Sequence, residues 1–255
     1  MKQKTVLIAL FASIFSCATS NAQNDGLSLR ADIGVGLPSG VGTAYSYNNT
    51  VTTVAPYSLG SGFNIAVAGN YMFSEHMGAG LDLNYMVGYT STTTYKESNP
   101  ITTTNVSTGS LFAITPNVIL SANSGKINPY ARFGIVIGVP SFEVKSTQSS
   151  TGAASGTNIE TYTGGVAIGW YAGFGVQFPL TDKLKLNVEL FDRDLTYAPT
   201  TDTNTQAYDG QQKQPTKTMS TSYDIASGTN GENTAYLPFG SVGFKVGIAM
   251  NLASK

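Results

Sequence analysis

Apolar and polar residues alternate along most of this chain. Between Leu27 and Leu37 every second residue is apolar, and the positions between them hold Ser28, Arg30, Asp32 and two glycines. Side chains on a β-strand point alternately to opposite faces, so this pattern predicts a strand with one apolar and one polar side. A helix would need a period of about 3.6 residues, and the glycines would weaken it.

The same alternation returns seven more times and predicts eight strands in all. The further segments cover residues 63–73, 79–89, 111–120, 130–139, 166–178, 184–191 and 242–252. Short connections lie at 74–76, 121–126 and 179–183, whereas long ones lie at 38–60, 90–109, 140–164 and 198–237. Short turns at one end and long loops at the other are typical of outer-membrane barrels, and both chain ends then lie on the short-turn, periplasmic side.

The second face of these strands favours a membrane barrel over a soluble β-sandwich. A sandwich turns its apolar face inward and needs a charged exterior, whereas here the second face holds mainly glycine, alanine and asparagine. Small residues suit a narrow lumen, and a sheet in lipid must close to pair its backbone groups. We therefore predict an all-β fold, an eight-stranded antiparallel up-and-down transmembrane β-barrel with long extracellular loops.

The long connections carry patterns of their own. A hairpin is expected around Asn48 and Asn49, and threonine-rich segments at 92–96 with 101–106, and at 142–147 with 158–163, predict strands that continue above the membrane. The longest connection, 198–237, is rich in Gln, Thr, Asn and Gly, which predicts a mobile segment.

The N-terminus has the pattern of a secretory signal peptide. Lys2 and Lys4 precede an apolar stretch, and Ser20-Asn21-Ala22 offers a small-x-small cleavage site. The predicted domains are a signal peptide at 1–22 and an outer-membrane β-barrel at 23–255. An alternative is lipidation at Cys17, although the bulky Phe15 departs from a lipoprotein box. No later segment approaches about 18 consecutive apolar residues, so no membrane helix is expected.

Composition narrows the possible functions. Charged residues make up only 11% of the chain, against about a quarter in ordinary soluble domains, and the net charge is −1. Without a basic excess, nucleic acid is not an expected partner. One histidine and one cysteine exclude a Cys/His zinc site and an internal disulfide framework.

The polar face places several charged residues inside the predicted barrel. They are Arg30, Asp32, Asp82, Arg132, Lys185, Glu189 and Lys245. Buried charges must be paired, so the favoured interpretation is a network of ion pairs that plugs the lumen, with Lys245 paired to Glu189 or Asp32. The alternative is a selectivity filter in a narrow pore for small solutes.

Catalysis is not expected. His76 is placed beside Glu75 in a short turn, and no Ser/His/Asp set is available at the strand ends. Asp192 and Asp194 flank Arg193, an arrangement that is more typical of solvated charges than of paired catalytic acids. We predict no catalytic residues, no metal site and no cofactor.

The chain resembles the OmpA/OmpX-like small outer-membrane barrels, including the opacity-type porin family. The resemblance rests on the signal peptide, the spacing of the eight strands, the closing strand, and the strand that opens with Asn128-Pro129-Tyr130-Ala131-Arg132-Phe133-Gly134. The chain departs from these barrels by running past Leu252 to Lys255 instead of ending on an aromatic residue, and by lacking a peptidoglycan-binding domain. We expect a monomer in outer-membrane lipid, inserted by the barrel assembly machinery. Because functional variety lies on loops held by a rigid scaffold, we expect a structural role, or adhesion or binding of an extracellular ligand through the loops. Transport of small solutes is the alternative function.

Overall fold

The computed structural model describes residues 26–39, 59–96, 101–124, 127–150, 156–208, 213–218 and 237–252. Regular secondary structure in these residues consists of β-strands, and none of them forms a helix long and apolar enough to cross a membrane. The segment assigned to the signal peptide, Cys17 and the hairpin expected around Asn48 lie outside the described residues.

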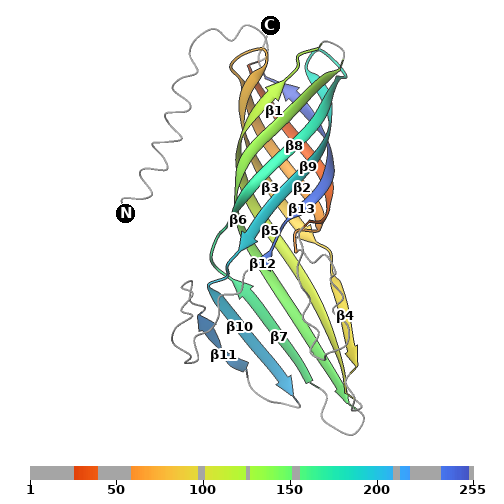
Figure 1. The fold of residues 1–255 in the computed structure, drawn as a ribbon, viewed down its shortest axis with the longest axis vertical. Helices are drawn as coiled ribbons and strands as arrows, with labels where there is room; N and C mark the ends of the chain where they lie inside the picture. The colour runs from red at the N-terminus through yellow and green to blue at the C-terminus, as the bar shows by residue number, and fades with distance from the viewer. Residues whose placement is uncertain are drawn as a thin grey trace, which may run out of the picture.

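Eight of the strands close into a barrel, as the alternation predicts (Figure 1). Each pairs with the next in antiparallel orientation, and the last pairs with the first. In order around the ring they are β1 (Leu27–Pro38), β2 (Gly62–Met72), β3 (Met77–Gly88), β5 (Ile101–Ser121), β6 (Asn128–Ser150), β8 (Ala167–Pro179), β9 (Leu184–Tyr197) and β13 (Ser241–Asn251).

The ring is strongly staggered. Stepping from each residue to its cross-strand partner leads from Leu37 to Val242, then to Asp192, and on around the barrel. The path returns to β1 at Leu27, ten residues away from Leu37 on the same strand. A stagger of this size makes the strands tilt by roughly 40° from the barrel axis. Side chains that meet inside the barrel therefore come from distant positions in the sequence.

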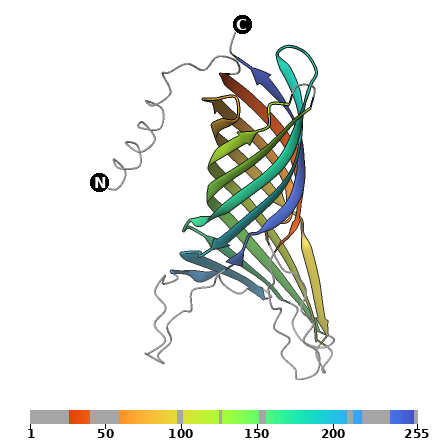
Figure 2. The ribbon, with the colours of Figure 1, turned by 45° about the horizontal axis from the view of Figure 1, so that its top comes forward.

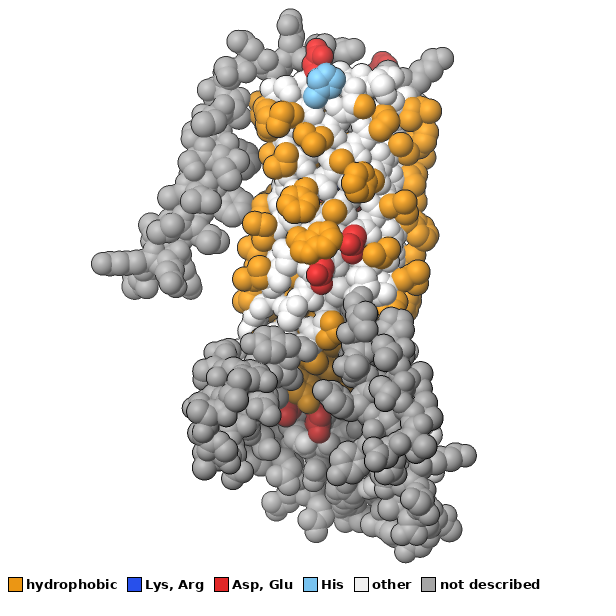
Figure 3. Space-filling view, viewed as in Figure 1, with side chains coloured by type: hydrophobic (Ala, Val, Ile, Leu, Met, Phe, Trp, Pro, Cys, Tyr) orange, Lys and Arg blue, Asp and Glu red, His pale blue; other side chains and the backbone are white. Residues whose placement is uncertain are grey.

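The two faces of the strands have the predicted orientation. Apolar side chains such as Ile33, Ile135 and Phe174 are 57%, 56% and 69% exposed, whereas the polar side chains that alternate with them are buried in the lumen. Apolar side chains gather over the barrel wall in Figure 3. In an aqueous protein such exposure would be costly, so this wall is the surface that faces lipid.

Two of the wall strands continue far beyond the barrel. Residues 101–109 of β5 and 141–150 of β6 pair with each other beyond the ring, on the side away from the short turns, and four further strands extend them sideways. We call this region the crown sheet; it also contains β4 (Ser91–Lys96), β7 (Gly156–Thr163), β10 (Thr201–Tyr208) and β11 (Lys213–Thr218). Its order is β11-β10-β7-β6-β5-β4 (Figures 1 and 2). The two threonine-rich hairpins expected from the sequence are confirmed by these pairings.

The prediction of a mobile segment at 198–237 is wrong for its first part. Strand β10 pairs with β7 along its whole length, and β11 pairs with β10, whereas β12 (Leu237–Pro238) pairs with the end of β9. Composition misled because threonine suits a strand exposed to water, and because β7 supplies backbone partners that no local pattern reveals.

Proteolysis of intact cells tests the sidedness. Strand β11 contains Lys213 and Lys217 at the edge of the crown sheet, whereas Lys183 lies exposed in the short turn between β8 and β9. We expect trypsin added to intact cells to cut at the β11 lysines and to cut at Lys183 only after permeabilisation, with mass spectrometry identifying the fragments. Cleavage at Lys183 in intact cells would show that the topology is inverted.

Candidate functional site: a sealed lumen

A compact cluster of charges lies in the half of the lumen nearest the short turns. The guanidinium group of Arg30 contacts three carboxylates: its Nε lies 2.9 Å from Asp32 Oδ2, its Nη2 3.2 Å from Asp82 Oδ2, and its Nη1 3.0 Å from Glu189 Oε2. Arg132 pairs with Asp82 and lies 3.4 Å from Glu189 Oε2. All five side chains are almost completely buried. The structure thus brings five of the seven expected lumen charges into direct contact.

Glu189 receives two tyrosine hydroxyls in addition to the two arginines. Tyr130 donates to Oε2 over 2.9 Å, and Tyr171 donates to Oε1. Both tyrosines lie on the inward face, but a search for charged residues alone passes over them. A carboxylate with this many donors is held in one position, so Glu189 is the central acceptor of the cluster.

The prediction that Lys245 pairs directly with Glu189 or Asp32 is wrong. Lys245 lies opposite Glu189 in the register, yet its Nζ donates to the Tyr171 hydroxyl over 3.0 Å. The same Nζ lies 4.6 Å from the ring centre of Tyr171 and 4.8 Å from that of Phe191. Since Arg30, Arg132 and the tyrosines already surround Glu189, the lysine is linked to this carboxylate through Tyr171.

The seventh expected residue, Lys185, lies nearer the end of the barrel. It is partly buried and lines a polar recess at the short-turn end, together with Ser28, Asn70 and Asn251. The lumen is therefore polar where it opens toward the short turns and becomes fully enclosed at the charge cluster.

Arg193 is a lumen residue that the sequence analysis missed. Its side chain is 3% exposed, and its Nη1 donates to Asn84 Oδ1 over 2.9 Å, while its Nη2 donates to Ser241 Oγ over 3.0 Å. Arg193 has the same parity as Glu189 along β9, so alternation alone could have placed it inside. The neighbouring Asp192 and Asp194 instead point to the outside of the wall.

The half of the lumen nearest the crown sheet holds Arg193 and, around it and beyond it, a cluster of apolar side chains. Leu59 and Phe239 come from the loop ends that precede β2 and β13, and Phe239 packs edge-on against Tyr197 with ring centres 5.8 Å apart. Backbone bonds hold both in place, from Leu59 N to the Pro238 carbonyl and from Phe239 N to the Leu195 carbonyl, each 2.9 Å. The buried apolar cluster also includes Met86, Leu111, Ala113, Val136, Phe142, Ala167, Tyr171, Phe191 and Leu195.

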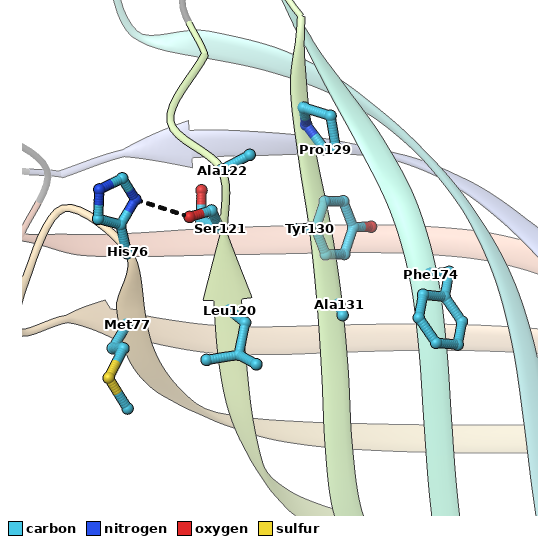
Figure 4. A pocket seen from close by; sticks show the side chains of 9 residues that line it. All are labelled: His76, Met77, Leu120, Ser121, Ala122, Pro129, Tyr130, Ala131 and Phe174. Carbon is cyan, nitrogen blue, oxygen red and sulfur yellow. Dashed lines mark hydrogen bonds between the residues drawn. The ribbon is translucent and has the colours of Figure 1, made fainter.

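His76 lies on the outside of the barrel. Its Nδ1 donates to the Ser121 carbonyl over 3.0 Å, at the rim of a shallow depression lined by apolar side chains such as Met77, Leu120 and Phe174 (Figure 4). These three side chains face outward and are 44%, 52% and 69% exposed. The histidine therefore lies apart from the lumen carboxylates, at the short-turn edge of the lipid-facing wall.

Two successive layers therefore block the lumen. They are the charge cluster and, on its crown-sheet side, the apolar cluster. In planar lipid bilayers we expect the protein to show no stable open state, and Phe239→Ala to remain closed because the charge cluster still obstructs the barrel. Single-channel recording checks both. A stable conductance above leak in the unaltered protein would show that the lumen is a pore.

These features define a small transmembrane β-barrel that holds a charge cluster and an apolar cluster in its lumen and carries a sheet that projects from its loop side. Residues 7–214 match the family model described as outer membrane protein beta-barrel domain. The chain belongs to this family, which indicates a location in the outer membrane. No curated protein sequence matches the chain.

Several solved barrels resemble it at low identity. Neisserial surface protein A is 14% identical, with 89% of this chain and 97% of that chain covered and a TM-score of 0.42. A major outer membrane protein from Thermus thermophilus is 13% identical, with 88% and 98% covered and a TM-score of 0.49. Ail, the attachment invasion locus protein of Yersinia pestis, is 13% identical, with 89% and 97% covered and a TM-score of 0.36.

Proposed function

We propose that this barrel is a non-enzymatic surface protein that binds an extracellular protein ligand, and so mediates adhesion, through its crown sheet. The observation that carries the proposal is the continuation of β5 and β6 from the barrel wall into a sheet beyond the membrane. A sealed lumen gives the barrel the role of an anchor, and functional variety then lies in the segments that the anchor presents.

The β4 edge of the crown sheet suits the capture of an extended peptide segment, whereas the β11 edge carries Lys213, Pro215 and Lys217, which discourage strand addition. Strands β4 and β11 stand at the two ends of the strand order, so among the described residues one side of each has no neighbouring strand. An open edge offers backbone N–H and C=O groups to a further strand, and β-strand addition is a common mode of peptide recognition. Thr92 and Thr94 on β4 are exposed, so no bulky or charged group stands at these two positions.

The crown sheet is also held ready for binding. Because β5 and β6 are continuous from the barrel into the sheet, the rigid wall fixes its orientation. Less conformational freedom is lost when a partner binds a preformed edge than when it orders a loose loop.

Cells that display the protein provide the test. We expect them to adhere more strongly than non-displaying cells to plates coated with laminin, fibronectin or collagen. Thr92→Lys with Thr94→Lys should abolish most of this gain, since lysines on an edge strand discourage strand addition. Thr147→Lys on the internal strand β6 is the matched control, because Thr147 is exposed and in line with Thr94 in the register, but β5 separates it from the edge.

The outcomes separate the possibilities. Equal adhesion of displaying and non-displaying cells on all coatings would overturn the adhesive function. Loss of adhesion with Thr147→Lys, but not with the β4 variant, would move the binding surface from the edge to the outer face of the sheet.

A further inference from the structure

One face of the crown sheet carries an oxygen-rich cluster that neither the barrel nor the proposed edge binding explains. This face continues the lumen side of β6, on which Phe142 stacks against Tyr162 of β7 with ring centres 5.7 Å apart. On the same face, further along β7 and the adjacent β10, lie Asn158, Glu160 and Asn204. We call these three residues the crown cluster.

Glu160 is the centre of the crown cluster. Its Oε1 accepts hydrogen bonds from Asn158 Nδ2 over 3.0 Å and from Asn204 Nδ2 over 3.3 Å, and its Oε2 accepts one from the Tyr162 hydroxyl over 3.0 Å. Asn204 is the direct cross-strand neighbour of Glu160. Two amide groups from different strands thus converge on one carboxylate oxygen.

This arrangement satisfies the carboxylate but not the amides. Among the residues that the structure describes, no hydrogen-bond donor reaches the buried Oδ1 atoms of Asn158 and Asn204, and the same holds for Asn105 Oδ1 on β5. Buried acceptors without donors are rare in folded proteins and indicate a missing partner. Since an amide presents either its NH₂ group or its oxygen to a given point, rotating the two amides would direct both oxygens toward Glu160.

The partner that would make such a rotation favourable is a cation. A carboxylate and two amide oxygens are hard ligands of the kind that Ca²⁺ prefers, with water completing its usual six to eight oxygens. Asp202 lies on the same face, between Tyr162 of β7 and Lys217 of β11 in the register, and is not counted among the ligands. Among the crown-sheet side chains that the structure describes, the one lysine is Lys145, which has the opposite parity on β6 and is exposed.

We propose that Asn158, Glu160 and Asn204 form a Ca²⁺ site that ties β7 to β10 on the extracellular side. Affinity is expected at roughly 0.1–1 mM, the range of extracellular calcium modules. The site is independent of the edge strands, so its failure would leave the proposed adhesion standing.

Terbium luminescence on the full-length barrel, folded in detergent micelles, tests the site. Tyr162, hydrogen-bonded to Glu160, is placed to sensitise Tb³⁺ emission, and Ca²⁺ should displace the ion. We expect Glu160→Gln to weaken Tb³⁺ binding at least tenfold. Glu143→Gln is the matched control, because Glu143 lies on the adjacent β6, exposed and of opposite parity to Phe142, and it should leave binding unchanged.

A gain-of-function variant guards against a merely structural effect. Asn204→Asp places a second carboxylate against Glu160, so it should raise Tb³⁺ affinity at least fivefold. The proposal is overturned if the unaltered protein gives no Ca²⁺-displaceable emission. It is equally overturned if Glu160→Gln and Glu143→Gln bind Tb³⁺ alike, or if Asn204→Asp binds no better than the unaltered protein.

Discussion

Replacing Glu189 by alanine is expected to destabilise the folded barrel by about 3–5 kcal/mol, the range found when one partner of a buried ion pair is removed. The change strips Arg30 and Arg132 of a shared carboxylate and leaves two buried tyrosine hydroxyls without an acceptor. Urea unfolding in lipid vesicles, followed by tryptophan fluorescence of Trp170, measures the loss. Ser28→Ala, in the polar recess, is a control expected to change stability by less than about 0.5 kcal/mol.

The coupling between residues provides a sharper test of the cluster. Arg30→Ala and Glu189→Ala together should cost about 1–3 kcal/mol less than the sum of the two single changes, because each removes the other's unpaired charge. The pair Lys245 and Glu189 should show weaker coupling, since Tyr171 stands between them. Strictly additive losses for Arg30 and Glu189 would indicate a hydrated lumen in which these charges do not depend on each other.

Replacing Ile135 by arginine is expected to cost about 2–4 kcal/mol, the penalty for a cation on the lipid face near the bilayer midplane. Ile135 is 56% exposed on the outer wall, in the middle of the barrel portion of β6. The same vesicle unfolding assay measures the effect. Leu27→Arg is the matched control, because Leu27 is 45% exposed at the short-turn end of β1 and the cost there should fall to about 0–1 kcal/mol.

Gly134, the neighbour of Ile135 that faces the lumen, is not a position at which a larger side chain would be tolerated. A Cβ added at Gly134 would collide with the Pro116 carbonyl and would lie 2.8 Å from the Asn117 Cβ. At Gly80 an added Cβ would lie 2.6 Å from Asn70 Oδ1 and 2.8 Å from Asn117 Oδ1. At both positions the neighbouring atoms leave no room in the lumen for a side chain.

Equal costs for arginine at Ile135 and Leu27 would contradict the assignment of the membrane boundary.

The ring of strands is predictable from sequence because burial on one side and lipid on the other impose the same period of two on every barrel strand. That period also places Arg30, Asp32, Asp82, Arg132 and Glu189 inside. It does not determine their partners, because the stagger brings together residues such as Arg30 and Glu189, 159 positions apart. The indirect link from Lys245 through Tyr171 depends on side-chain conformations that alternation does not encode.

The apolar layer of the lumen escapes sequence analysis for a different reason. Leu59 and Phe239 each stand at the end of a long connection, next to a glycine and outside any periodic run. Only the closure of the ring shows that these two loop ends meet over the barrel opening. Strand β10 escapes sequence analysis in the same way, because its hydrogen-bond partners come from β7, far away in the sequence, and β11 in turn pairs with β10.

The uninterrupted course of β5 and β6 has a mechanical consequence. A pull on the outer tip of the crown sheet runs along these two strands, parallel to their length, and enters the barrel wall without passing through a hinge (Figure 2). Tension in this direction loads as shear the hydrogen bonds that join β5 to β3 and β6 to β8 in the wall, so many bonds bear it at once, whereas a sideways pull would open them one at a time. A cell tethered through the crown sheet would therefore transmit drag from flowing liquid to the membrane through the connection best shaped to resist it.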